Sequence, residues 1–295
     1  MNYNDKVEKL LKLQYVSNLI MQKSISLRVA AIAISLAFLV GSAAWASHSW
    51  NGYHWARTSS PFTLNLVDSV TTGWNSYLKT TSDDWSVSTA LDTTIVSGND
   101  SSATRKRCSA VLGKDRVCNA AYGNNGWLGL AQVWVYSDGH IAQGVVKLND
   151  TYFNTSTYNT PAWRNLVMCQ EVGHTLGLAH VDEVFNNANL GTCMDYTNDP
   201  NGGPGGASET DPSNEHPNAH DYTQLESIYA HLTDAFNSFS NAASTAKATN
   251  AADINTSSPK EWGKAVKQDA RGKNSLYERD LGNGEKLFTF VVWAD

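Results

Sequence analysis

The spacing of apolar residues predicts a helix and a strand early in the central part of the chain. Val70, Trp74, Tyr77 and Leu78 follow a helical period, and Asp68 is placed to cap the start of that helix. The following stretch, "TALDTTIVSG", has the composition of a strand. We therefore expect a helix and then a strand over this part of the chain.

Downstream, the pattern predicts a hairpin and two further helices. The runs "WLGLAQVWVY" and "IAQGVVKLND" flank Asp138-Gly139, which favours a tight turn between two strands. The stretch "TPAWRNLVMCQEVGHTLGL" reads as a helix that starts at Thr160-Pro161. The stretch "DYTQLESIYAHL" predicts a last helix, with Asp221 as the candidate N-cap. The apolar stripe of this helix consists of Leu225, Ile228, Tyr229 and Leu232.

The C-terminal part differs from the preceding chain in composition and in apolar pattern. Residues 236–259 are rich in Ala, Ser, Thr and Asn and are expected to form a linker. Residues 260–295 alternate and contain the turn signal Asn283-Gly284, which predicts a small β meander. The expected organisation is a main domain over 47–235, the linker, and a small β-rich segment.

The N-terminal 46 residues have the layout of a secretory signal peptide region. Lys23 and Arg28 precede an apolar run from Val29, and the A-x-A site Ala44-Trp45-Ala46 follows it. Met21 is a possible true start. The apolar run is nearly long enough to span a bilayer, so an uncleaved membrane anchor is the alternative. The small-residue site favours cleavage near Ala46 and a secreted protein.

Export places the four cysteines in an oxidising compartment, where they are expected to form two disulfides. Cys108 and Cys118 flank a short loop, and Cys169 and Cys193 lie in and just after the central helix. Four cysteines allow three connectivities, and we expect these two local pairs. For Cys169, a buried free thiol and a metal ligand are the alternatives.

The net charge argues against one class of partner. The 295 residues carry a net charge of −6 without a broad basic excess, so we expect no nucleic-acid partner.

The central helix contains the candidate chemistry in "MCQEVGHTLGLAH". Gln170 and His174 are four residues apart and project from the same face of a helix. Glu171 lies about 100° around the helix, within reach of a water at the same site. Gly177 can end the helix and return His180 toward His174. Two ligands on a helix, a glycine stop and a third ligand form a compact site for one metal ion.

This helix, followed by "CMDYT", resembles the metzincin clan of zinc endopeptidases, and the upstream strand pattern is similar to its matrixin branch. The resemblance runs from roughly Tyr53 to Leu232. It implies an α+β fold with a twisted mixed sheet, an active-site helix and a Met-turn. It also implies that Met194 lies under one catalytic Zn²⁺, and two branches of the clan place a Tyr near the metal at the spacing of Tyr196.

One departure from the clan pattern matters: Gln170 stands where the clan has its first His ligand. An amide oxygen is a weak ligand for Zn²⁺ beside imidazole, and a hydrogen bond from Gln170 to nearby backbone is the alternative. Tyr196 can equally be a core residue. His216, His220 and His54 are interpreted as loop histidines, with a substitute ligand as the alternative for each.

Three hypotheses follow for function. The first is a secreted, monomeric zinc endopeptidase in which Glu171 is the general base and Tyr196 stabilises the oxyanion. An extended peptide would add to the edge strand "IAQGVVKLN". The second is a catalytically inactive metzincin-fold secreted binding protein. The third is a surface-attached structural protein that is held by an uncleaved N-terminal helix and interacts through its β tail.

Overall fold

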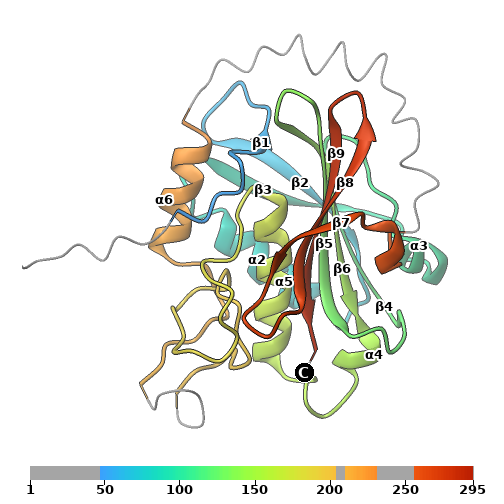
Figure 1. The fold of residues 1–295 in the computed structure, drawn as a ribbon, viewed down its shortest axis with the longest axis vertical. Helices are drawn as coiled ribbons and strands as arrows, with labels where there is room; N and C mark the ends of the chain where they lie inside the picture. Colours follow the sequence, from blue (N-terminus) through green and yellow to red (C-terminus); the bar gives the residue numbers. More distant parts are fainter. Residues whose placement is uncertain (1–46, 204–209, 231–255, 295) are drawn as a thin grey trace, which may run out of the picture. The chain divides into compact units, whose positions relative to one another are not determined.

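A computed structural model describes residues 47–203, 210–230 and 256–294 (Figure 1). The predicted signal peptide region, Met21, Leu232 and residues 236–255 of the predicted linker lie outside the described residues. No helix in the described part is both long enough and apolar enough to cross a bilayer.

The described residues form an α+β structure in which one twisted mixed sheet carries helices on its faces. The strands are β1 (His54–Trp55), β2 (Phe62–Ser69), β3 (Leu91–Ser97), β4 (Asp115–Ala120), β5 (Trp127–Val135), β6 (His140–Asn149), β7 (Lys264–Gln268), β8 (Asn274–Gly282) and β9 (Glu285–Trp293). The helices are α2 (Asn75–Trp85), α3 (Ser102–Arg107), α4 (Asp150–Phe153), α5 (Pro161–Thr175), α6 (Ala219–Ile228) and the 3₁₀ turn η1 (Pro259–Glu261).

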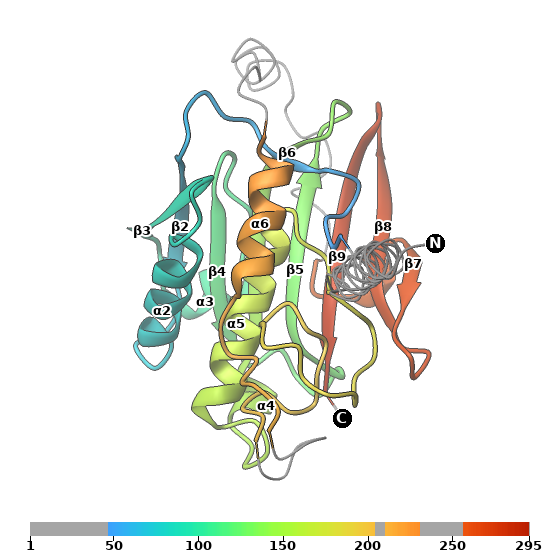
Figure 2. The ribbon, with the colours of Figure 1, turned by 90° about the vertical axis from the view of Figure 1, so that its left-hand side faces the viewer.

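The strand order is β3-β2-β4-β6-β5-β9-β8-β7, and β1 pairs with one end of β6. The first four strands in this order run parallel to one another. The pairs β6–β5, β5–β9, β9–β8 and β8–β7 are antiparallel. The predicted C-terminal β meander is therefore present, and it continues the same sheet through the pairing of β9 with β5 (Figure 2).

The sheet is covered on both sides near its centre, which explains why β5 and β6 are buried along almost their whole length. Helices α2, α5 and α6 lie in front of the sheet in Figure 2, over the main apolar core. On the opposite side, Trp262 packs with Trp127, Leu130 and Val291. A second small cluster there contains the Cys108–Cys118 disulfide, which joins the end of α3 to β4.

Two predicted helix caps are wrong. Asp68 lies in β2, because the parallel pairing of that strand with β4 continues to Ser69, and α2 begins after Trp74. In α6 the N-cap is Asn218, and Asp221 is the third helical residue. The Asp221 carboxylate accepts a hydrogen bond from the Asn218 amide, so it completes a capping box and does not start the helix.

The prediction that a peptide adds to an edge strand formed by "IAQGVVKLN" is also wrong. The stretch "IAQGVVKLN" forms most of β6, which lies between β4 and β5. Both neighbours pair with its backbone, so β6 has no free edge for a peptide.

Candidate functional site

Helix α5 carries most of the candidate residues, and local sequence defines its start and the turn after its end. The Thr160 hydroxyl accepts a hydrogen bond from the Trp163 amide, and Pro161 occupies the first turn, where no donor is needed. Just beyond the helix, Gly177 has a φ of +101°, and a Cβ there would lie 2.3 Å from the Tyr53 carbonyl oxygen. Only glycine fits both conditions, so the chain can turn back toward the helix here.

That turn brings the imidazole rings of His174 and His180 together, with their Nε2 atoms 3.0 Å apart. Nδ1 of His174 lies 2.8 Å from the Leu178 carbonyl oxygen, and Nδ1 of His180 lies 3.1 Å from Oε1 of Glu183. Both partners are acceptors, so each Nδ1 carries a proton. In the neutral rings the two Nε2 lone pairs then face each other. This arrangement is favourable when a proton or a cation lies between the two nitrogens.

The surroundings of the His174 ring disfavour its protonation. Burial, and next the neighbouring His180, lower the pKa of His174 well below its usual range. The neutral ring is therefore preferred, and a neutral ring is the form that binds a metal ion. A carbonyl or a carboxylate on Nδ1 is also the usual partner that orients a histidine ligand.

Two histidines alone do not complete a metal centre. Throughout residues 47–203, 210–230 and 256–294, no group of three His, Cys, Asp or Glu side chains is arranged to hold a metal ion. Since structural and catalytic zinc sites take at least three protein ligands, the remaining ligand would have to come from another residue type. Gln170 is the candidate from the sequence.

Gln170 is buried and held by backbone. Its amide nitrogen donates hydrogen bonds to the carbonyl oxygens of Cys193, at 2.7 Å, and Asp195, at 2.8 Å. Because both partners are acceptors, the NH₂ group must face them, and Oε1 is the atom of this side chain whose lone pairs can bind a cation. The backbone hydrogen bonds are thus present, and the ligand role of Oε1 stays a prediction.

Glu171 lies between α5 and β5. Its side chain is fully buried, and neither carboxylate oxygen has a hydrogen-bond partner within the described part of the chain. A Cβ on Gly129 would lie 2.5 Å from Oε1 of Glu171, so the carboxylate lies directly against the β5 backbone. Burial raises the pKa of Glu171 well above its usual range. A buried carboxyl group without a hydrogen-bond partner, one helical turn before His174, is typical of a functional site.

The segment around Met194 is linked covalently to α5 and packs against it. A disulfide joins Cys169 of the helix to Cys193. A Cβ on Gly173 would lie only 2.4 Å from the Met194 sulfur, so the thioether lies against the helix backbone. Met194 is fully buried. Its predicted place under a metal ion stays a prediction.

Tyr196 faces the C-terminal segment. Its ring centroid lies 4.7 Å from that of His180, but its hydroxyl accepts a hydrogen bond from the Arg271 guanidinium at 3.4 Å. Burial raises the pKa of Tyr196 above its usual range. The C-terminal segment therefore holds the group that was expected to stabilise an oxyanion.

The C-terminal strands also close the site. The Phe290 ring of β9 stacks on His174, with centroids 4.0 Å apart and an angle of 9° between the planes. Lys267 of β7 forms a 2.8 Å ion pair with Oε1 of Glu183, the oxygen that faces His180. The candidate residues are at most 3% exposed: Gln170, Glu171, His174, His180 and Tyr196. The sequence pattern did not predict that Phe290, Lys267 and Glu183 contact the site. Of these, only Glu183 lies close to the motif in sequence, three residues after His180.

The other predicted histidines lie elsewhere. His216 is paired with Asp84 at 2.7 Å, and His220 lies 3.1 Å from a ring nitrogen of His48. His54 contacts the ring of His140 near the start of β6. None of the three joins the imidazole pair of His174 and His180.

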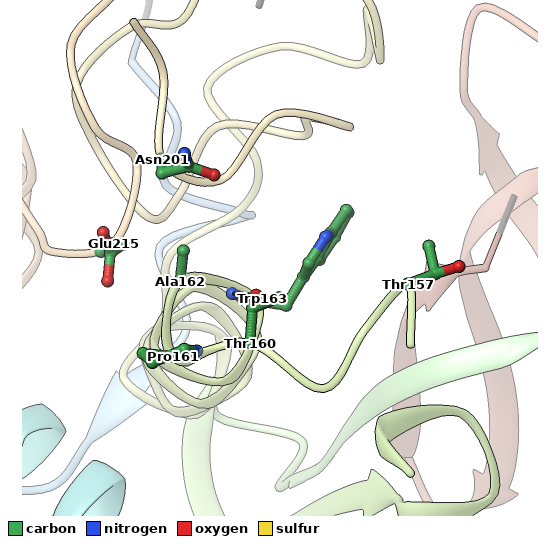
Figure 3. A pocket seen from close by; sticks show the side chains of 7 residues that line it. All are labelled: Thr157, Thr160, Pro161, Ala162, Trp163, Asn201 and Glu215. Atoms are coloured by element: carbon green, nitrogen blue, oxygen red, sulfur yellow. Dashed lines mark hydrogen bonds between the residues drawn. The ribbon is translucent and has the colours of Figure 1, made fainter. Parts of the chain in front are cut away.

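An open pocket of about 380 Å³ lies at the opposite end of α5. Thr160 and Trp163 line it from the helix start, and Glu215 lines it from the loop before α6 (Figure 3). About 11 helical residues separate Trp163 from His174, roughly 16 Å at 1.5 Å per residue. We therefore assign the candidate site to the buried imidazole pair and not to this pocket.

Comparison with known proteins gives similarity at the level of solved structures. No protein-family model and no curated protein matches the chain. High choriolytic enzyme 1, a hatching enzyme zinc-protease from the medaka fish Oryzias latipes, is 10% identical, with a TM-score of 0.34; the match covers 61% of this chain and 96% of that one. Myroilysin is 12% identical, with a TM-score of 0.35, and the match covers 62% of this chain and 98% of that one.

Proposed function

We propose that the chain is a secreted, zinc-dependent endopeptidase of the metzincin type, and that the described arrangement is a closed state of its site. One observation carries the proposal: the imidazoles of His174 and His180 present facing Nε2 atoms 3.0 Å apart, and the buried, unpartnered carboxyl group of Glu171 lies three residues before His174 on the same helix. A fold that needed only packing at this place would have no use for two facing lone pairs and an unpartnered carboxyl group.

In the proposed reaction, the residues that would hold zinc are His174 and His180, through Nε2, with Oε1 of Gln170 as the weaker third ligand. The bound ion would polarise the scissile carbonyl and make water more acidic. Glu171 takes the proton from the attacking water and passes it to the leaving amine. Tyr196 donates a hydrogen bond to the oxyanion once its hydroxyl is free of Arg271. Glu183 is a positioning residue, because it fixes the tautomer and orientation of His180.

The proposed substrate is an extended peptide and the proposed location is outside the cell, with the chain acting as a monomer. Two disulfides, Cys108–Cys118 and Cys169–Cys193, agree with an oxidising compartment.

A second candidate is a catalytically inactive binding protein with the same fold. The two hydrogen bonds from the Gln170 amide favour it, since they hold the Met194 segment whether or not a metal ion is present. In that case the site would be a relic whose glutamine has become structural.

Zinc content and peptide cleavage test the proposal. The mature chain should bind about one zinc ion, and His174→Ala should lose it. With added zinc, Glu171→Gln should keep the metal and lose at least about 100-fold in cleavage rate, because it removes the general base and no ligand. Absence of zinc at every added concentration would refute the metal site. Cleavage that survives Glu171→Gln would place the chemistry elsewhere.

Gln170→His separates the two candidates. Imidazole is the better ligand, so zinc should bind more tightly in this variant. A working peptidase should also cleave faster, whereas the inactive binding protein should gain zinc without gaining hydrolysis.

A further inference from the structure

Strand β5 would be the edge of the sheet if β9 were not paired with it. Among the strands that precede the predicted linker, β5 is the last in the sheet and has β6 on one side. Its neighbour on the other side is β9, which follows the linker. The pairing is antiparallel and runs from Trp127 opposite Trp293 to Val135 opposite Lys286. Since Gly129 of β5 lies against Glu171, the covered strand borders the proposed catalytic carboxylate.

The side chains of β9 alternate between the two faces of the sheet. Phe288, Phe290 and Val292 belong to the core that includes α5, while Leu287 and Val291 pack on the opposite side. On the α5 side, Phe290 stacks on His174. The neighbouring Phe288 ring lies 4.6 Å from that of Trp50. An extended segment thus presents an aromatic ring to one of the proposed metal ligands.

The rest of the C-terminal segment contacts the site at its polar groups. Lys267 pairs with Glu183, and the Ala270 amide donates to the Glu183 carbonyl oxygen at 2.8 Å. The Arg271 guanidinium lies over the Phe185 ring, 3.5 Å from its centroid, and donates to the Tyr196 hydroxyl. The contacts of the C-terminal segment are therefore with Glu183 and Phe185, which follow His180, and with Tyr196, which was expected to act in catalysis.

We propose that β9 occupies the peptide-binding edge of β5 as a built-in substrate analogue, and that substrates are extended segments with bulky aromatic side chains at alternate positions. Backbone pairing with β5 would give such a segment its affinity, and the pockets for alternate side chains would give specificity. A substrate must displace β9, so the C-terminal segment holds the site inactive until it separates. The regulatory part of this inference rests on the proposed peptidase function, but the binding part does not.

The contact between Lys267 and Glu183 gives a matched pair of variants. Lys267→Glu places two carboxylates together and should favour separation of β7–β9 from the site. Lys264→Glu makes the same charge change on the same strand, at an exposed position that is paired with Glu278 inside the C-terminal segment. The probe is a fluorescently labelled peptide of residues 285–294, EKLFTFVVWA, and a second peptide with Phe288 and Phe290 both replaced by Ser is the sequence control.

Binding is measured by fluorescence anisotropy on the full chain without added zinc. Lys267→Glu should lower the Kd of the probe roughly threefold to tenfold, because a larger fraction of molecules has β5 free. Lys264→Glu should match the wild type, and the serine peptide should bind weakly to all three proteins. Equal Kd values for the three proteins, or equal binding of the two peptides, would overturn the inference.

A crosslinked variant gives an independent test in case Lys267→Glu does not fold. Gln132 and Thr289 are directly opposite each other in the β5–β9 pairing, so cysteines at both positions should form a disulfide that locks β9 in place. The locked protein should bind no probe, while each single-cysteine variant binds like the wild type. Probe binding to the locked protein would refute occupancy of this edge. Probe binding to Lys267→Glu without zinc-dependent cleavage would instead count against the peptidase function and leave the inference standing.

Discussion

The Asp115 carboxyl group, at the start of β4, is fully buried against α5. Its Oδ2 atom lies 2.8 Å from the Thr175 hydroxyl, and that hydroxyl also lies 2.7 Å from the Val172 carbonyl oxygen. A hydroxyl has one proton to donate, and the carbonyl can only accept. Both hydrogen bonds form when Asp115 is protonated and donates to Thr175. Burial correspondingly raises the pKa of Asp115 to about 7.

This protonation predicts a pH dependence of stability. Between pH about 4 and about 7 the folded chain holds a proton on Asp115 that the unfolded chain has released, so the contribution of this group to stability falls as pH rises through that window. Asp115→Asn should remove this dependence. At pH 8 the variant should be more stable than the wild type, by on the order of 2–4 kcal/mol, and at pH 4 the difference should nearly vanish.

Urea unfolding at several pH values measures the effect. Asp92→Asn, on the half-buried side chain of β3, is the matched control for the loss of a strand carboxylate. An Asp115→Asn profile parallel to that of the wild type would show that the carboxyl group is charged in the folded protein.

At this scale the sequence predicted the candidate residues but not their partners. The spacing from Gln170 to His180 places the side chains on one helix and the turn after it, and the structure brings His174 and His180 together. The partners of Gln170 and Tyr196 come from segments whose positions depend on the whole fold. Spacing along a helix carries no information about such contacts.

The close approach of α5 to β5 depends on the absence of a side chain at Gly129. A Cβ at that position would lie 2.5 Å from both Oε1 of Glu171 and Cγ1 of Val167. The helix and the strand would have to separate, or the two buried side chains would have to change rotamer. This contact explains a glycine in the middle of an otherwise large, apolar strand.

Gly129→Ala should therefore destabilise the protein by about 1–3 kcal/mol, which is the usual cost of overpacking a core. Gly73→Ala is the control: a Cβ there meets nothing within 4 Å, so stability should change little or rise slightly. The midpoints of chemical denaturation compare the two variants. A Gly129→Ala protein as stable as the wild type would show that β5 and α5 pack less tightly than described here.

Elements with strong local signals were predicted well. The hairpin at Asp138-Gly139, helix α5 and the turn at Asn283-Gly284 all have residues that fix local conformation. Strand β4 was read as part of a loop between cysteines, and β2 was not predicted, since Asp68 near its end was taken as the cap of a helix. Those two strands are stabilised by parallel neighbours distant in sequence, which leave little local pattern.

At the scale of the molecule, the C-terminal strands share one sheet and one core with the rest of the described residues. Phe288, Phe290 and Val292 pack in the same core as α5, and Trp262 packs against β5 from the other side. The sequence predicted a meander there, but the pairing of β9 with β5 joins strands from opposite sides of the predicted linker, and no local pattern specifies it.

One cooperative unfolding transition is the expected consequence. Tryptophan fluorescence and far-UV circular dichroism should give the same urea midpoint, because separation of the C-terminal segment exposes the central core and leaves the open form a minor population that unfolds at once in urea. Trp262→Phe removes a reporter from the C-terminal segment and should leave the fluorescence midpoint coincident with that of circular dichroism. A separate early fluorescence phase that loses amplitude in this variant, with Trp293 supplying the remainder, would show that the segment unfolds independently.

The stack of Phe290 on His174 makes the closed state visible to nuclear magnetic resonance. With centroids 4.0 Å apart and planes nearly parallel, the imidazole carbon-bound protons lie in the ring current of the phenyl group. Their resonances should be displaced upfield, and they should move toward ordinary histidine positions when β9 leaves. Isotopic labelling of histidine would thus report the fraction of open molecules directly, without substrate or metal.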